Sequence, residues 1–372
     1  MPVNVVHIFD VGDFEQQIRR GTELLKQGGI VVVPTETVYG AAGLLGNATA
    51  MSKLRDFRGG PTNRPFTVHV AQPSDAERFL GPVSDLGSRM MRKLWPGPVA
   101  LVFEVPEDRR RTVAAQLGAR EQDMFEDGTI TLRCPDHIVA TEVLRNAATP
   151  VVLTRVDAVP DKDGLLNFAQ LDGKVDLIFD AGPARFAKPS TMVRVKENSY
   201  EIVRAGIYDD RIIQRLLRTT VLFVCSGNTC RSPMAEALAR RIIARKLNVH
   251  EDELEARGYS VLSAGCFALP GARATQHAVD AVQELGGDMS RHRSRPLSLE
   301  LIHQADVIYT MGKSHAQAVV ALVPGAADKT SPLDPEGEDI EDPIGGDASL
   351  YRELANSLHA LIEKRLSESI LK

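Results

Sequence analysis

The sequence predicts two α/β domains, the first with a mixed sheet and the second with a doubly wound parallel sheet. The chain has 372 residues, which is long for one ordinary domain. Along it, apolar runs of strand length alternate with stretches of helical spacing, as in α/β proteins. The alternation is more regular in the second half, which favours a parallel sheet with its site at the carboxyl ends of the strands.

The first half opens with a helical stretch, Phe14–Lys26, that ends at Gly28 and Gly29. The predicted buried strand Ile30–Val33 follows and ends at Pro34. Later apolar runs predict further strands over Phe66–Val70, Val99–Val105, Thr129–Arg133, Val151–Thr154, Leu177–Phe179 and Thr191–Val195. Helical stretches separate them, so we expect a sheet of mixed direction.

The domain boundary is expected in the stretch YDDRIIQRLLR, residues 208–218, which has helical spacing and acids at its front. We therefore expect a first domain over 1–210, a short helical connector over 211–219 and a second domain over 220–372. The connector lacks the glycine and serine of a flexible linker, which favours docked halves.

In the second half, the strand Val221–Val224 runs through a glycine-containing turn into a helix from about Pro233. The remaining predicted elements are the strands Tyr259–Ser263 and Asp306–Thr310 and the helices Ala274–Leu285, Ser314–Leu322 and Ser349–Leu366.

The composition is 43% hydrophobic and 25% charged, as in soluble globular proteins. A net charge of −5 argues against a general nucleic-acid scaffold. The longest apolar runs are far too short for a membrane span, and the first residues do not resemble a signal peptide. Four cysteines lack the spacing of a disulfide scaffold or a zinc site. We expect a cytoplasmic protein with no membrane partner.

The turn in VCSGNTCRSP has the composition of a phosphate-binding loop, with five residues between Cys225 and Arg231. Backbone N–H groups of a curled loop at a helix N-terminus bind anions, and Gly227 and Asn228 tolerate the positive φ that such a loop needs. Sites of this kind lower a cysteine pKa from about 8.5 to about 3.5–7.5, so we expect an ionised, nucleophilic Cys225. Arg231 can hold two phosphate oxygens, and Ser232 can stabilise the departing sulfur.

Cleavage also needs a proton donor for the leaving group. The candidate is Asp342 in DIEDPIGG, which could act as an acid first and then activate the water that hydrolyses a phosphocysteine. Its neighbours Asp339 and Glu341 are alternatives for that role.

The second half resembles the low-molecular-weight protein-tyrosine phosphatases over nearly all of residues 221–372. The family's motifs occur in order, namely CSGNTCRSP, the SAG at 263–265, the HRSR at 292–295, the AD…M at 305–311 and the DP at 342–343. The resemblance implies that Cys225 is the nucleophile, Arg231 the phosphate clamp and Asp342 the general acid, with no metal or other cofactor. The phosphate-binding residues would be Ser226, Gly227, Asn228, Thr229, Cys230 and Ser232. A buried cysteine beside an unrelated arginine is the alternative, but five ordered motifs oppose it.

The expected substrate is a phosphoprotein, with phosphotyrosine and phosphoarginine both open. Thr229 resembles the protein-arginine phosphatase branch, because tyrosine-specific members carry a bulkier aliphatic residue there. Ile344 occupies a place where tyrosine phosphatases have an aromatic wall, which weakens stacking on a phenyl ring. Cys230 could form a protective reversible disulfide with Cys225, or it could be a small buried residue.

The first half resembles the YrdC-like threonylcarbamoyl-AMP synthases over about residues 10–210, through PTETVYG, NRPFTVHV, LWPGPVALVF, TLRCPDH, PSTMVRV and IVRAGI. This resemblance implies an open twisted mixed sheet with helices. It also implies condensation of threonine, bicarbonate and ATP with Mg²⁺ for tRNA modification. The residues that fall on family positions for ATP and threonine binding are Thr35, Arg58, His69, Ser190, Thr191 and Arg204.

Two segments depart from that family's pattern. Arg58-Gly59-Gly60 lacks a second cation, and Arg155-Val156-Asp157 replaces a hydroxyl by a guanidinium and an amide by an acid. Arg155 could compensate for the missing cation if it enters the site. Two hypotheses remain, a bifunctional enzyme and a phosphatase with a non-catalytic module that binds nucleotide or RNA.

Overall fold

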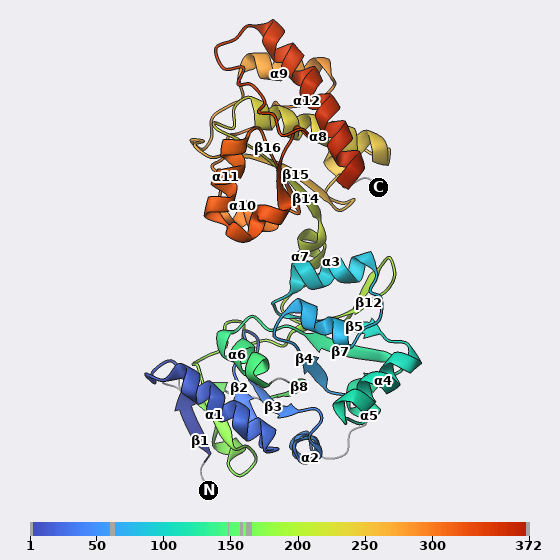
Figure 1. Ribbon diagram of the computed structural model, residues 1–372, viewed down its shortest axis with the longest axis vertical. Helices are drawn as coiled ribbons and strands as arrows, with labels where there is room; N and C mark the ends of the chain where they lie inside the picture. The colour runs from blue at the N-terminus through green and yellow to red at the C-terminus, as the bar shows by residue number, and fades with distance from the viewer. Residues whose placement is uncertain (1–2, 60–63, 148, 157–158, 161–165, 370–372) are drawn as a thin grey trace. The chain divides into compact units, whose positions relative to one another are not determined.

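The computed structural model describes residues 3–59, 64–147, 149–156, 159–160 and 166–369. The chain divides into two compact units, Met1–Ile213 and Gln214–Lys372 (Figure 1). This division falls within helix α7 (Asp210–Leu217). The domain limits 1–210, 211–219 and 220–372 remain our proposal.

The first unit is built on a mixed sheet, and eleven strands of the described residues belong to it. In spatial order they are β1 (Asn4–His7), β11 (Leu177–Asp180), β2 (Val31–Val33), β3 (Gly40–Leu44), β8 (Val151–Arg155), β4 (Thr67–His69), β7 (Thr129–Arg133), β5 (Val99–Glu104), β12 (Thr191–Val195) and β13 (Tyr200–Arg204), with β6 (Phe125–Glu126) beside β7. The pairs β1–β11, β11–β2, β4–β7 and β5–β12 are parallel, and the other pairs are antiparallel. The prediction of a mixed sheet is therefore confirmed.

The α-helices of this unit are α1 (Phe14–Lys26), α2 (Ala48–Phe57), α3 (Asp85–Leu94), α4 (Glu107–Leu117), α5 (Glu121–Met124) and α6 (Ile138–Ala147). Helix α1 has its predicted limits, and Gly28 follows it in the left-handed region at φ +82°. Ile18 of α1 and Val143 of α6 share a hydrophobic cluster with Val31 and Val33 of β2. Side chains alternate along a strand, so one face of the sheet supports both helices.

The second unit has four parallel strands among its described residues, in the order β15 (Tyr259–Gly265), β14 (Thr219–Cys225), β16 (Val307–Thr310) and β17 (Thr330–Pro332). Its α-helices are α8 (Arg231–Leu247), α9 (Gln276–Glu284), α10 (Leu299–Gln304), α11 (Lys313–Leu322) and α12 (Ala348–Ser369). These are the expected strand and helix regions, together with β17 and α10.

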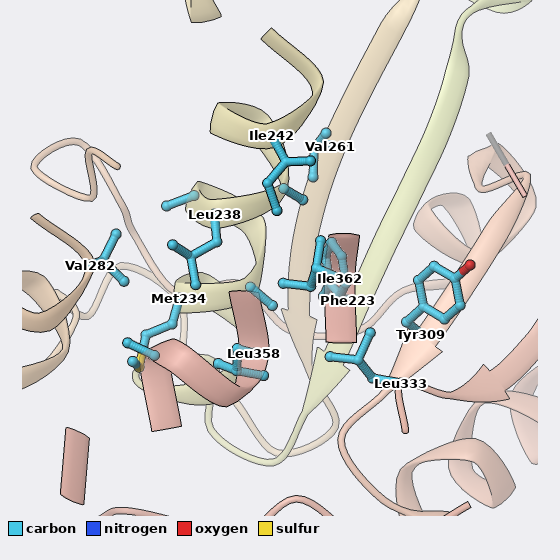
Figure 2. Packing of buried hydrophobic residues seen from close by; sticks show 14 of the residues in the cluster. Phe223, Met234, Leu238, Ile242, Val261, Val282, Tyr309, Leu333, Leu358 and Ile362 are labelled. Atoms are coloured by element: carbon cyan, nitrogen blue, oxygen red, sulfur yellow. The ribbon is translucent and has the colours of Figure 1, made fainter. Parts of the chain in front are cut away.

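Residues of β14 alternate between two cores, one on each face of the sheet. Phe223 packs in a cluster with Leu238 of α8 and Leu358 of α12 (Figure 2). Leu222 and Val224 belong to a second cluster with residues of α10 and α11. Helices therefore cover both faces, as the prediction of a doubly wound sheet requires.

Across the described helices, none combines the length and the apolar character that crossing a bilayer demands.

Candidate functional site

The phosphate loop of the second unit joins the carboxyl end of β14 to the first turn of α8. Cys225 is the last residue of β14 and is 2% exposed, and α8 begins at Arg231. The Cys225 Sγ atom lies 2.9 Å from Ser232 Oγ and accepts a hydrogen bond from the Asn228 N–H at 3.2 Å. A hydroxyl and a backbone N–H therefore meet at the sulfur, where they can stabilise charge during a reaction.

Asn228 determines the shape of this loop. It has φ +54°, and its side-chain Nδ2 donates to Ser232 Oγ at 2.9 Å and to Ser263 Oγ at 2.8 Å. Its Oδ1 accepts from the Arg295 N–H, and its carbonyl lies 2.9 Å from His292 Nε2. Asparagine tolerates the left-handed region better than most residues, and these bonds hold it there.

Arg231 lies at the mouth of the loop. Its Nη1 donates to the Ile340 carbonyl at 2.9 Å, and its Nη2 donates to Ser226 Oγ at 3.4 Å. The same Nη2 forms an ion pair with Asp342. The guanidinium of Arg231 thus joins the phosphate loop to the loop after β17, and both loops contact it at the mouth of the site.

Asp342 is the acid that lies beside the Arg231 guanidinium. Asp339 instead accepts a hydrogen bond from the Lys313 N–H at 2.7 Å, at the start of α11. Glu341 is exposed, and the described residues give it no hydrogen-bond or ion-pair partner. The geometry therefore favours Asp342 over its two neighbours as the proton donor to a group held by Arg231.

The first unit contains a cavity of about 380 Å³. Five of the six predicted binding residues line it, together with Tyr39, Arg133 and Arg155; the five are Thr35, Arg58, His69, Ser190 and Arg204. Four arginines thus face one cavity, which favours a ligand that carries several negative charges.

Arg133 has the most buried guanidinium of this cavity. Its Nη2 donates to Glu36 Oε1 and to Thr37 Oγ1, each at 2.8 Å, and the Arg133–Glu36 pair is almost fully buried. Its Nε is buried and has no hydrogen-bond partner among the described residues. Because unpaired buried donors are costly, this N–H fits an acceptor supplied by a ligand.

Two further arginines are held by contacts at the cavity wall. Arg58 donates to Thr154 Oγ1 at 2.7 Å and stacks over the Phe66 ring, and its burial lowers its pKa to about 10. Arg204 donates to the carbonyl and the hydroxyl of Ser190. Burial lowers the pKa of Arg204, and Arg133 and Arg155 lower it further. An anionic ligand would relieve this repulsion.

The second unit matches the family model for low molecular weight phosphotyrosine protein phosphatases over residues 220–372. A protein-arginine-phosphatase from Bacillus subtilis is 37% identical over 157 residues, which are 41% of this chain and 97% of that protein. This half of the chain belongs to the low-molecular-weight phosphatase family. Another protein-arginine-phosphatase, from Geobacillus stearothermophilus, is 38% identical over 154 residues, or 40% of this chain and 95% of that protein. The solved YwlE arginine phosphatase from Geobacillus stearothermophilus shares 36% identity, covers 41% of this chain and 96% of its own, and gives a TM-score of 0.35.

The first unit matches a family model described as telomere recombination, which carries the names Sua5, yciO and yrdC, over residues 23–206. A threonylcarbamoyl-AMP synthase from Bacillus subtilis is 28% identical over 195 residues, which are 52% of this chain and 54% of that protein. The chain thus spans about half the length of that relative. A Mycobacterium leprae relative is 30% identical over 211 residues, which are 55% of this chain and 90% of its own length. The first half belongs to this Sua5–YrdC family.

Two expectations about the phosphatase loop concern the backbone of Gly227 and the thiol of Cys230. Gly227 does not have positive φ, so among the loop residues named for that conformation Asn228 alone adopts it. Cys230 is a buried free cysteine whose Sγ lies 3.5 Å from both Thr275 Oγ1 and Tyr351 OH. Burial and this contact with Cys230 raise the pKa of Tyr351. In this structure Cys230 is a small buried residue with a free thiol. A protective disulfide with Cys225 stays a prediction.

Among the residues predicted for the Sua5–YrdC cavity, Thr191 does not line it. It is fully buried, and its Oγ1 donates to the Tyr208 carbonyl at 2.7 Å and accepts from the Tyr208 N–H at 2.9 Å. Both hydrogen-bonding capacities are used within the fold, and the neighbouring Ser190 lines the cavity instead. Arg133 lines the cavity but was not among the predicted residues. The signal available was an arginine that ends the buried run Thr129–Arg133.

The segments that depart from the Sua5–YrdC pattern are only partly described. Arg155 lines the cavity, as its suggested compensating role requires, and Arg58 lines it too. Gly60 and Asp157 lie outside the described residues.

His69 should make the first unit sensitive to acid. Its Nδ1 lies 3.1 Å from the Thr67 carbonyl, and burial, followed by repulsion from Arg133, lowers its pKa to about 3. The unfolded chain takes up this proton below about pH 6.5, before the folded chain does, so stability is complete above that pH and is lost as the pH falls toward 3. The expected slope is about 1.4 kcal/mol per pH unit.

Trp95 is the one tryptophan in the sequence and is buried in the first unit. Its fluorescence in urea titrations at pH 7 and pH 5 therefore measures that unit. His69→Gln should flatten the pH dependence between the two values, and an unchanged dependence would contradict the assignment.

Proposed function

We propose that residues 220–372 dephosphorylate phosphoproteins through a phosphocysteine at Cys225, with phosphoarginine as the preferred substrate. The observation that carries this proposal is the convergence of the Asn228 N–H and the Ser232 hydroxyl on the Cys225 sulfur, with Arg231 and Asp342 at the mouth of the loop. This arrangement offers a nucleophile, a leaving-group stabiliser, an oxyanion clamp and a proton donor within one site.

In the first step, the Cys225 sulfur attacks phosphorus while the bond from phosphorus to the substrate nitrogen or oxygen breaks. Asp342 gives its proton to that leaving atom, and Arg231 exchanges its contact with Asp342 for phosphoryl oxygens. In the second step, the Asp342 carboxylate takes a proton from water, and the water oxygen attacks phosphorus. The sulfur–phosphorus bond breaks, inorganic phosphate leaves, and Ser232 stabilises the released sulfur.

Phosphoarginine is favoured by the relatives and by the rim of the site. Protein-arginine-phosphatases match over 95% or more of their length. Ile344 follows Asp342-Pro343 and is 68% exposed, so this position supplies no aromatic ring to stack on a phenyl group. Phosphotyrosine is the second candidate, because the tyrosine phosphatase EpsP of Ralstonia solanacearum is 38% identical over 77% of its length.

The substrate preference is tested with matched phosphoarginine and phosphotyrosine peptides. We expect kcat/KM for phosphoarginine to exceed that for phosphotyrosine by about tenfold or more, a difference of about 1.4 kcal/mol. Thr229→Ile should reduce this ratio, because it replaces a hydroxyl by the bulk of an aliphatic side chain. A strong phosphotyrosine preference that Thr229→Ile leaves unchanged would overturn the assignment to phosphoarginine.

For residues 1–210 we propose threonylcarbamoyl-AMP synthesis from threonine, bicarbonate and ATP. The support is the cavity of four arginines and the unpaired Nε of Arg133, which fit the carboxylate and phosphate oxygens of these substrates. The described residues contain no group of three or more His, Cys, Asp or Glu side chains that could hold a metal. The resemblance implies Mg²⁺, which would supply charge neutralisation to the triphosphate, and the arginines of the cavity would contact the same ligand.

This proposal is tested by the release of pyrophosphate. Pyrophosphate should form only when ATP, threonine and bicarbonate are all present, and Arg133→Met should reduce it about 10²-fold or more because the variant removes the buried cation. No pyrophosphate above background would favour the alternative, a module that binds nucleotide or RNA without turning it over. A measurement of ATP binding by the same protein would then distinguish a nucleotide-binding module from an RNA-binding module. We also propose a cytoplasmic location, because the nucleophilic thiol of Cys225 acts only while it is reduced.

A further inference from the structure

A buried histidine contacts the phosphate loop and has no role in the two steps described above. His315 is the third residue of α11 and is 7% exposed. Its Nε2 lies 2.9 Å from Ser226 Oγ, which in turn lies 3.4 Å from Arg231 Nη2. His315 therefore reaches the phosphate clamp through a single hydroxyl.

The surroundings of His315 determine which ring nitrogen carries its proton. The Nδ1 atom is buried and has no hydrogen-bond partner in the described part of the chain. A proton there would leave a buried N–H unpaired, which is rarer and costlier than an unused acceptor. The proton is therefore assigned to Nε2, which donates to Ser226 Oγ.

The charged groups that face His315 come from two other elements. Arg231 of α8 opposes a positive imidazole, whereas Asp339 and Asp342 of the loop after β17 favour one. Burial has the largest effect and lowers the pKa of His315, and Arg231 lowers it further. A neutral imidazole with its proton on Nε2 is consistent with these surroundings.

With this assignment, Ser226 Oγ accepts from two nitrogen donors. Arg231 always donates, and His315 donates through Nε2. A hydroxyl oxygen has two acceptor positions and one proton, so neither of these two contacts uses the Ser226 proton. The same Arg231 Nη2 also contacts Asp342, so the hydroxyl lies beside the place where the guanidinium would take a phosphoryl oxygen.

We propose that His315 is a positioning residue that turns the Ser226 hydroxyl toward the phosphoryl group held by Arg231. Ser226 then adds a side-chain donor to the backbone N–H groups of the loop, and this donor is oriented before substrate arrives. Oriented donors act most strongly when charge develops in the transition state. The inference rests on the phosphatase function proposed above.

The test is a double-mutant cycle in the full chain with an aryl phosphate as substrate. His315→Phe keeps a ring but removes the donor, and Ser226→Ala removes the hydroxyl. Each variant should lower kcat about tenfold, somewhat less than the loss of a full oxyanion-hole donor. The double variant should be no slower than the slower single variant, because both changes remove one interaction. His315→Gln, whose amide can donate to Ser226, should recover most of the rate.

Three measurements separate positioning from a general structural role. The melting temperature and the rate at which iodoacetate alkylates Cys225 should stay at wild-type values in His315→Gln and Ser226→Ala. Competitive inhibition by vanadate, an oxyanion with the phosphoryl charge, should weaken in Ser226→Ala and His315→Phe by similar factors. His303→Phe, at an exposed position of α10, is the matched histidine control and should keep wild-type kinetics.

The proposal fails if Ser226→Ala keeps the wild-type kcat, and this outcome does not depend on whether His315→Phe folds. It also fails if the two rate losses multiply, or if alkylation of Cys225 slows in proportion to kcat. A wild-type protein with no turnover that depends on Cys225 would instead refute the phosphatase function itself, so the two failures are distinguishable.

Discussion

Replacing Cys225 by serine is expected to abolish turnover of a generic aryl phosphate, to below about 10⁻⁴ of the wild-type rate. Serine can keep the contacts with the Asn228 N–H and the Ser232 hydroxyl, so the loop should retain its shape. A hydroxyl is a far weaker nucleophile than a cysteine at neutral pH. The loss should therefore appear in kcat, measured by phosphate release, while vanadate or inorganic phosphate still binds.

The matched control for this variant is Cys266→Ser. The Cys266 N–H donates to the Cys225 carbonyl, and burial and then the neighbouring Cys225 raise the pKa of the Cys266 thiol. This second thiol is therefore near the loop but poorly suited to attack. Turnover lost in Cys266→Ser and kept in Cys225→Ser would reverse the assignment of the nucleophile.

Asp342→Ala should slow the enzyme to an extent that depends on the leaving group. With phenyl phosphate, which needs a proton to depart, kcat should fall about 10²–10⁴-fold. With p-nitrophenyl phosphate the fall should be much smaller, because nitrophenolate leaves without protonation. Phosphate affinity should be kept or increased, because Arg231 loses the carboxylate that pairs with it.

Steady-state kinetics with the two aryl phosphates measure this difference directly. Glu341→Ala removes a neighbouring exposed acid and should leave both rates close to wild type. Equal losses with the two substrates in Asp342→Ala would show that Asp342 holds Arg231 in place and is not the proton donor. A loss in Glu341→Ala that matches the loss in Asp342→Ala would transfer the role to the neighbour.

The phosphatase half could be predicted from sequence because its signals are local. The strand Thr219–Cys225, the loop and the start of α8 are consecutive, so the spacing of Cys225 and Arg231 fixes both ends of the loop. Gly227 does not adopt the positive φ that it tolerates, because a glycine permits that conformation without requiring it. The contacts of Asn228 with Ser263 and Arg295 come from distant parts of the chain, and no local pattern gives them.

In the first half, the local sequence does not predict every strand of the sheet. Strand β3 has the sequence GAAGL, whose small residues do not favour strands, yet it lies between β2 and β8. A Cβ on Gly40 would lie 2.7 Å from Leu153 Cδ2, and one on Gly43 would lie 2.8 Å from Leu54 Cδ1. Close packing by neighbours therefore places β3 in the sheet. The position of Arg133 in the cavity wall likewise depends on a partner that is distant in the sequence, Glu36.

The bonds around Asn228 have a consequence for protein engineering. The curvature of the catalytic turn is set jointly by residues at 228, 232, 263, 292 and 295. A graft of the short cysteine-to-arginine motif into another protein would lack most of these supports and would not hold its bend. Chimaeras between relatives should therefore exchange the three supporting segments together, and leave variation in specificity to exposed positions such as Ile344.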